Sequence, residues 1–118
     1  MQTEVRPVDA QIDELRTIYE FREPDEVRAY LIANPDLLPL VREAAAKLRA
    51  SLPGEGKLAL DVVVDPGDET DPGELFALFQ TRLTPAAIRP AFNRLTEKWF
   101  VAAGRPAGLR FNIDLEYR

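Results

Sequence analysis

The acidic stretch DPGDETDPGE, residues 65–74, is the part of the chain whose residue types most resemble a binding site. Calcium loops place oxygen ligands at alternate positions around a central glycine. Here Asp65, Asp68 and Asp71 recur every three residues, which does not match that spacing, and the Pro-Gly steps are typical of turns. We therefore predict a hairpin connection, with a cation site or a partner contact through Asp68, Glu69 and Asp71 as the alternatives.

A second set of carboxylates falls on two predicted strands, with Asp61 on one and Asp114 and Glu116 on the other. Paired carboxylates hold Mg²⁺ or serve glycoside hydrolysis in many enzymes. Three basic residues share the same sheet face and would pair with these acids: Lys57, Arg110 and Arg118. We therefore expect a solvent-exposed sheet face, with a metal-assisted hydrolase as the alternative.

The composition excludes much of enzyme chemistry. The chain has 118 residues with no histidine and no cysteine, and Ser51 is its only serine. These absences remove Ser-His-Asp and Cys-His catalysis, zinc fingers and disulfides. Any acid–base chemistry would use carboxylates, lysine or tyrosine. We predict no catalytic residue, no metal and no cofactor.

Charge and hydropathy give the broad class of the protein. Hydrophobic residues make up 46% and charged residues 30%, which is typical of a soluble globular domain. The chain lacks an apolar run of membrane-spanning length and a secretory signal, so we expect a cytoplasmic protein without membrane contact. The net charge of −5 and the pI near 4.8 argue against a nucleic-acid partner, because phosphates select basic surfaces.

Hydrophobic spacing predicts the elements that position these residues. Residues 1–16 form a polar segment in which the helical spacing of Val8, Ile12 and Leu15 favours a short helix, followed by an extended stretch. Capping residues and apolar stripes predict helices over residues 24–33, 34–52 and 84–103, the last bent at Pro90. Alternating polar and apolar residues predict strands over residues 57–65, 75–83 and 109–117.

This order of elements predicts one α+β domain over residues 17–118, with two N-terminal helices, a β-hairpin, a third helix and a C-terminal strand. The helix after the hairpin returns the last strand antiparallel to the first. We therefore expect a three-stranded antiparallel sheet in the order 2-1-3, with the helices mainly on one face.

The outward face of this sheet carries apolar residues that do not suit water: Ala59, Val63, Phe76 and Leu78. Either Ile12 and Tyr19 fold over them or another chain does. Phe100 points away from the core stripe of its helix and is either the rim of the core or a partner anchor. We therefore predict a non-enzymatic interaction module for a protein partner or a second copy, using Val63, Phe76, Leu78, Phe100 and the acidic loop.

Four motifs cover most of residues 17–117: YEF-x2-P-x-EV-x3-L-x2-NP-x-L, then L-x-L-x-VV-x-DP, then a helix ending in EKW, and a closing FNIDLE strand. Together they resemble a family of short bacterial proteins for which no activity is established. Because genes of that family lie beside small toxin-like genes, the resemblance implies an antitoxin-like inhibitor of a nuclease as an alternative function. The chain departs from the family pattern at Pro90 and over residues 97–100, where the family has two acids and two tryptophans.

Overall fold

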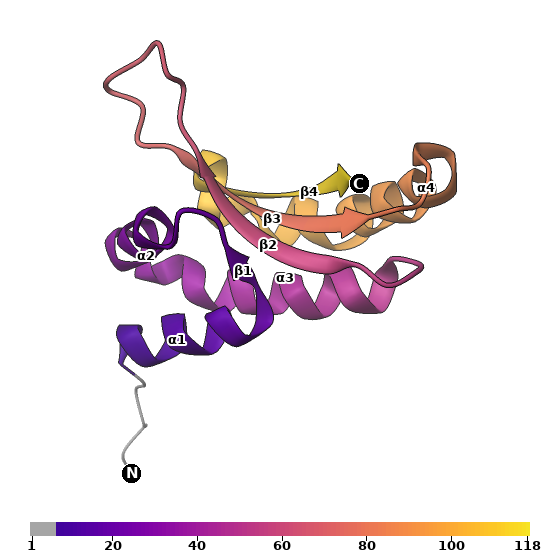
Figure 1. Cartoon of the computed structure of the whole chain (residues 1–118), viewed down its shortest axis with the longest axis horizontal. Coiled ribbons are helices and arrows are strands. Elements are labelled where there is room, and N and C mark those ends of the chain that lie inside the picture. Colours follow the sequence, from indigo (N-terminus) through magenta and orange to yellow (C-terminus); the bar gives the residue numbers. More distant parts are fainter. Residues whose placement is uncertain (1–6) are drawn as a thin grey trace.

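The computed structural model describes residues 7–118 and confirms an α+β fold (Figure 1). The first six residues of the predicted polar segment lie outside this range. The elements follow the chain in this order: α1 (Val8–Ile18), β1 (Glu20–Phe21), α2 (Pro24–Ala33), the 3-10 helix η1 (Pro35–Leu37), α3 (Leu38–Ser51), β2 (Lys57–Val63), β3 (Glu74–Thr81), α4 (Pro85–Leu95), the π-helix η2 (Thr96–Phe100), α5 (Val101–Ala103), the 3-10 helix η3 (Arg105–Arg110) and β4 (Phe111–Tyr117).

Local sequence accounts for several of these boundaries. Pro24 occupies the first turn of α2, where its missing N–H costs no hydrogen bond. The hydroxyl of Thr84 accepts a hydrogen bond from the Ala87 N–H and so caps α4. Pro90 lies inside α4, and Gly104 follows α5. None of the helices within residues 7–118 is long and apolar enough to cross a membrane.

Among residues 7–118 the sheet has four strands in the order β1-β2-β3-β4, so the predicted three-stranded antiparallel sheet in the order 2-1-3 is wrong. The hairpin β2–β3 is antiparallel as predicted, but β1 and β2 are parallel, and so are β3 and β4. β1 occupies the edge of β2 that the prediction left for the last strand. The helical crossover through α4 then brings β4 beside β3, which is the usual way to join parallel neighbours.

The register divides the sheet residues between two faces. Leu60 pairs with Ala77, and Ala77 with Ile113, and this row lies on the helix-covered face. The residues of that face are almost all buried: Phe21, Leu58, Leu60, Leu75, Ala77, Phe79, Phe111, Ile113 and Leu115. They form one core with the apolar sides of α2, α3 and α4. We call the other side, which includes Ala59, Asp61, Val63, Phe76, Leu78, Gln80, Asp114 and Glu116, the open face.

Within residues 7–118 three α-helices precede the hairpin: the two predicted N-terminal helices and α1, which lies where the polar segment was expected to form a short helix and is a complete element of the core. Ile12 and Leu15 of α1 are buried, and α1 packs against α2 and α3. The Tyr19 hydroxyl donates a hydrogen bond of 2.8 Å to the Val41 carbonyl of α3, and burial raises the pKa of Tyr19. Ile12 and Tyr19 therefore belong to the helix-side core, and the expectation that they fold over the open face is wrong.

The segment after α4 also differs from the prediction. The helix widens into η2, and the C-terminal strand begins at Phe111 rather than at residue 109. Leu109 is 87% exposed in the turn before that strand. The Phe100 ring packs at an angle on Phe111, with 6.0 Å between ring centroids. Trp99 donates its indole N–H to Glu43 of α3 over 2.5 Å, so both aromatic residues contact the body of the domain.

Candidate functional site

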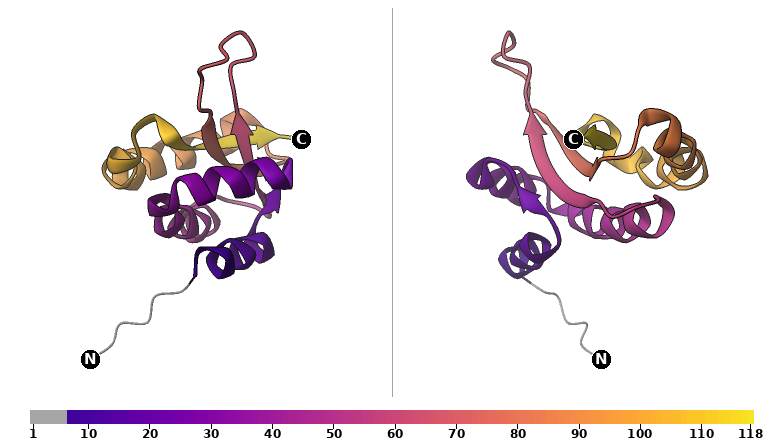
Figure 2. Two further views of the ribbon diagram at one scale, coloured as in Figure 1. Left: turned by 90° about the vertical axis from the view of Figure 1, so that its left-hand side faces the viewer. Right: turned by 45° about the vertical axis from the view of Figure 1, so that its right-hand side comes forward.

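The hairpin connection, residues 64–73, stands away from the body of the domain (Figures 1 and 2). Its aspartates hold it in a defined conformation through hydrogen bonds to the backbone. Asp65 accepts from the Gly67 N–H at 2.9 Å, Asp68 from the Thr70 N–H at 2.9 Å, and Asp71 from the Gly73 N–H at 2.9 Å. Each aspartate thus binds the backbone two residues further on, which is an Asx turn. The three-residue spacing of Asp65, Asp68 and Asp71 arises because one Asx turn follows another.

Further bonds join the turns into one structure. Backbone bonds link Asp65 to Asp68 at 3.1 Å and Asp68 to Asp71 at 3.2 Å. The second carboxylate oxygen of Asp71 accepts from the Asp65 N–H at 2.7 Å and closes the base of the connection. Hydrogen bonds from Thr70 lower the pKa of Asp68. The predicted hairpin turn is therefore confirmed, and its carboxylates serve the turns while keeping their negative charge at the surface.

The open face holds the residues that the sequence suggested for a partner. Phe76 pairs with Asp61 across β2 and β3, and Val63 pairs with Glu74 at the base of the hairpin connection. Val63 is 50% exposed, the adjoining Val64 is 46% exposed, and Phe76 and Leu78 are half-buried. We call Val63, Phe76 and Leu78 the apolar patch. Ala59, the fourth predicted residue, is fully buried beside it.

An arginine crosses this face. Arg22 follows β1 at one edge of the sheet, and Glu116 belongs to β4 at the other edge. The two terminal nitrogens of the Arg22 guanidinium each donate a hydrogen bond to one carboxylate oxygen of Glu116, and the bond from Nη1 to Oε2 is 2.6 Å long. Four strands span about 14 Å, so the two side chains extend toward each other over the open face. Figure 2 shows the strong curvature of β2.

The same network uses the carboxylates considered for catalysis. Asp61 lies 3.8 Å from the Arg22 guanidinium, and Gln80 donates to Glu116 at 2.8 Å. The hydrogen bond from Arg22 is the main cause that lowers the pKa of Glu116 to about 2. Asp114 accepts from its neighbour's backbone N–H, at Leu115. Within residues 7–118 no three acidic side chains gather in a way that could hold a metal ion.

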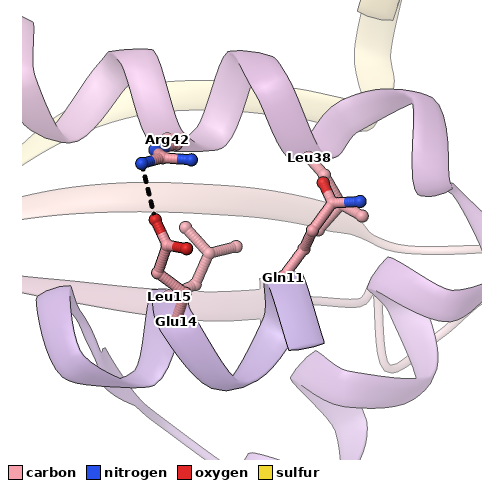
Figure 3. Close-up of a pocket in the computed structure, with 5 residues that line it drawn as sticks. All are labelled: Gln11, Glu14, Leu15, Leu38 and Arg42. Carbon is pink, nitrogen blue, oxygen red and sulfur yellow. Dashed lines mark ion pairs between the residues drawn. The ribbon is translucent and has the colours of Figure 1, made fainter. Parts of the chain in front are cut away.

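A small crevice lies between α1 and α3 (Figure 3). Gln11, Glu14 and Leu15 of α1 face Leu38 and Arg42 of α3, and Glu14 pairs with Arg42 at 2.7 Å. Its volume of 10 Å³ is enough for about one water molecule. The crevice is a packing gap between helices and not a ligand site.

Sequence reasoning missed a larger cleft at the end of the sheet opposite to the hairpin connection. We call it the basic cleft. It has a volume of 620 Å³ and is lined by Gly54, Glu55, Gly56, Lys57, Gln80, Thr81, Arg82, Leu83 and Arg118. The hairpin places Lys57, at the start of β2, near Arg82, which directly follows β3, and the parallel β4 adds Arg118. The sequence feature that could have indicated this cleft is the basic residue at the end of each of these strands: Lys57, Arg82 and Arg118.

The charges of the basic cleft are only partly compensated. Ion pairs among residues 7–118 involve four arginines: Arg22, Arg28, Arg42 and Arg110. Lys57 and Arg82 have no ion-pair partner in this part of the chain. An adjoining cavity of 350 Å³ shares Lys57 and adds Arg16 and Arg49. Basic residues that are distant in the sequence are therefore gathered at this end of the sheet.

Comparisons of the chain with family models, with curated proteins and with solved structures return no match. The hairpin connection, the open face and the basic cleft are therefore the features from which a function can be inferred.

Proposed function

We propose that the chain is a non-enzymatic, cytoplasmic protein-interaction module whose partner-binding surface is the apolar patch together with the hairpin connection. The observation that supports this proposal most directly is the exposure of Val63, which is 50% exposed on the open face and lies at the base of the ordered acidic arm. The partner is a protein with an apolar surface next to basic groups.

The physical properties of the two surfaces suit this role. Covering the apolar patch removes apolar side chains from water, which stabilises a complex by about 25 cal/mol per Å² of buried apolar area. The Asx turns of Asp65, Asp68 and Asp71 fix the arm before binding, so that little conformational entropy is lost when it docks. Its negative charges would steer a basic partner toward the patch.

The chemistry of the carboxylates supports the non-enzymatic part of the proposal. Glu116 is held ionised by Arg22 and Gln80, and a carboxyl group with a pKa of about 2 is a poor proton donor at neutral pH. Asp61 shares the same guanidinium. A metal-assisted hydrolase built on these residues would first have to displace Arg22.

A photo-crosslinking amino acid placed at position 63 tests the proposal in cells that naturally contain the protein. We expect a discrete cross-linked protein, identified by mass spectrometry, and its loss in a Phe76→Ser background. Ile32 on α2 is the matched control, because it is also 50% exposed but lies away from the open face. Equal products from positions 63 and 32, or no product from position 63, would contradict the proposal.

A second candidate function, an antitoxin-like inhibitor of a nuclease, is favoured by the acidic hairpin connection. Its regularly spaced carboxylates would mimic phosphates on the basic surface of the nuclease. The test is inhibition of a nuclease encoded beside this gene. Replacing Asp65, Asp68 and Asp71 with asparagine should abolish the inhibition, while Phe76→Ser should leave it. The opposite ranking of the two variants would assign the contact to the apolar patch.

A further inference from the structure

The basic cleft and the hairpin connection lie at opposite ends of the same two strands. β2 begins at Lys57, which lines the cleft, and ends at Val63, which precedes the hairpin connection. Three basic side chains line the cleft, Lys57, Arg82 and Arg118, and one acidic side chain, Glu55, lies among them, so the basic charges are in excess. Four acidic side chains lie in the hairpin connection: Asp65, Asp68, Glu69 and Asp71. The molecule therefore has one acidic end and one basic end.

We propose that the acidic hairpin connection of one copy docks into the basic cleft of a second copy, so that the chain associates head to tail. This inference rests on the proposed function in one respect, namely that the hairpin connection is a contact element. The apolar patch has no part in it.

Charge and order both support this occupant. Lys57 and Arg82 have no ion-pair partner within the described residues, so an incoming acidic group would not first have to break a bond to them. The carboxylates of the hairpin connection are already ordered by their own backbone bonds, and each is exposed or half-buried. A preorganised acidic loop loses little entropy when it enters a cleft that is already formed.

Geometry decides between contact within one chain and contact between chains. β2 has seven residues, which separates the two surfaces by about 20 Å along the strand. The hairpin connection therefore cannot reach the cleft of its own chain. A contact between two different surfaces is heterologous, so an open chain of any length has one free cleft and one free hairpin connection, and a ring forms where these two ends meet. The expected products are open chains or closed rings.

The net charge of −5 makes this association sensitive to salt. Copies repel one another on average, and only the two oppositely charged ends attract. Charges separated by more than about 10 Å are screened at 0.1 M salt. Because the attraction between the two ends is electrostatic, the association should weaken steeply as salt is raised above about 0.1 M.

Two complementary variants of the full chain test the inference. The cleft variant carries Lys57→Glu and Arg82→Glu. The hairpin variant carries Glu69→Lys together with asparagine in place of Asp65, Asp68 and Asp71. Asparagine keeps the side-chain oxygen that each Asx turn needs but removes the charge. A control with Lys98→Glu and Arg105→Glu makes the same charge change as the cleft variant but outside the cleft. Circular dichroism checks that every variant is folded.

Sedimentation velocity at low salt, over a range of concentrations, gives the readout. We expect the wild type and the control to form species larger than a dimer as concentration rises, and each complementary variant alone to stay monomeric. An equimolar mixture of the two variants should form a heterodimer and nothing larger. The cleft variant retains its hairpin connection and the hairpin variant retains its cleft, so only one productive contact is available between them.

Three outcomes would overturn the inference. They are a wild type that stays monomeric at every concentration, self-association that the cleft variant does not weaken, and a mixture that yields no heterodimer. Binding of a short single-stranded oligonucleotide to a monomeric wild type, lost in the cleft variant, would instead assign the cleft to nucleic acid. None of these results affects cross-linking at position 63, so failure of this inference is distinguishable from failure of the proposed function.

Discussion

Phe76 and Phe79 lie three residues apart on β3, yet their surroundings are opposite. Phe79 points to the helix-covered face and is 2% exposed, while Phe76 points to the open face and is half-buried. One face is fixed by packing, and the other combines exposed apolar groups with a single arginine that reaches across it. The packed core thus lies on one side of the sheet and the surface proposed for a partner on the other, and matched substitutions can test that separation.

The largest expected effect comes from truncating the two phenylalanines. Phe79→Ala should lower the free energy of unfolding by about 3–5 kcal/mol, because it leaves a cavity in a closely packed core. Phe76→Ala should cost about 1 kcal/mol, because water can occupy the space on the open face. Urea unfolding of both variants measures the difference. Equal losses of unfolding free energy in the two variants would show that Phe76 is as closely packed in solution as Phe79.

Gly56→Ala should have the next largest effect. A Cβ at Gly56 would collide with the Phe79 ring, so the backbone approaches that ring closely only because no side chain is present. We expect a loss of about 1–3 kcal/mol from overpacking. The Phe79→Leu background removes the aromatic ring and should relieve much of this loss. Thermal unfolding of the two single variants and the double variant measures the coupling.

On the open face, Glu116→Gln should cost about 1 kcal/mol at pH 7, since a partly exposed ion pair is screened by solvent. The pKa of Glu116 is lowered in the folded state, so its contribution is present above the unfolded pKa of about 4.3. That contribution is lost as pH falls toward 2. Wild type and variant should therefore differ in stability at pH 7 and converge near pH 2. A difference in the free energy of unfolding that stays constant between pH 7 and pH 2 would show that the ionised Glu116 carboxylate does not stabilise the fold.

The smallest effect is expected in the hairpin connection. Asp71→Ala removes the acceptors of the Asp65 and Gly73 N–H groups and should cost about 1 kcal/mol or less, because water replaces those bonds at the surface. Asp71→Asn keeps one acceptor and should cost less still. Hydrogen exchange at the Gly73 amide reports the opening locally. Faster exchange in the asparagine variant than in the alanine variant would exclude an Asx turn at this position.

Much of the helix-covered face could be predicted from the sequence. The alternation in 57–65 and 109–117 predicted the strands, and apolar spacing predicted the core sides of α2, α3 and α4. Alternation does not say which strands are neighbours, because the same pattern fits either edge of a hairpin. β1 has two residues, too few to show a period, so its occupation of the β2 edge could not be foreseen.

The candidate sites were less predictable, since they depend on contacts between distant residues. Arg22 and Glu116 are separated by 94 positions, and nothing near either residue indicates the other. The basic cleft is made by the ends of three strands, each of which carries a basic residue. The hairpin connection is different, because its turns are local and Asp-Pro-Gly spacing determines them. The predictions for Val63, Phe76 and Leu78 as partner residues remain predictions.

The contact between Arg22 and Glu116 has a consequence for the motions of the sheet. Folded proteins open locally in cooperative units, and the amide hydrogens of one unit exchange together. Here the first and the last strand share one ion pair, so the opening of either edge breaks the same bond. At neutral pH the amides of β1 and β4 should therefore exchange as one cooperative unit. Below the pKa of Glu116 they should exchange as two.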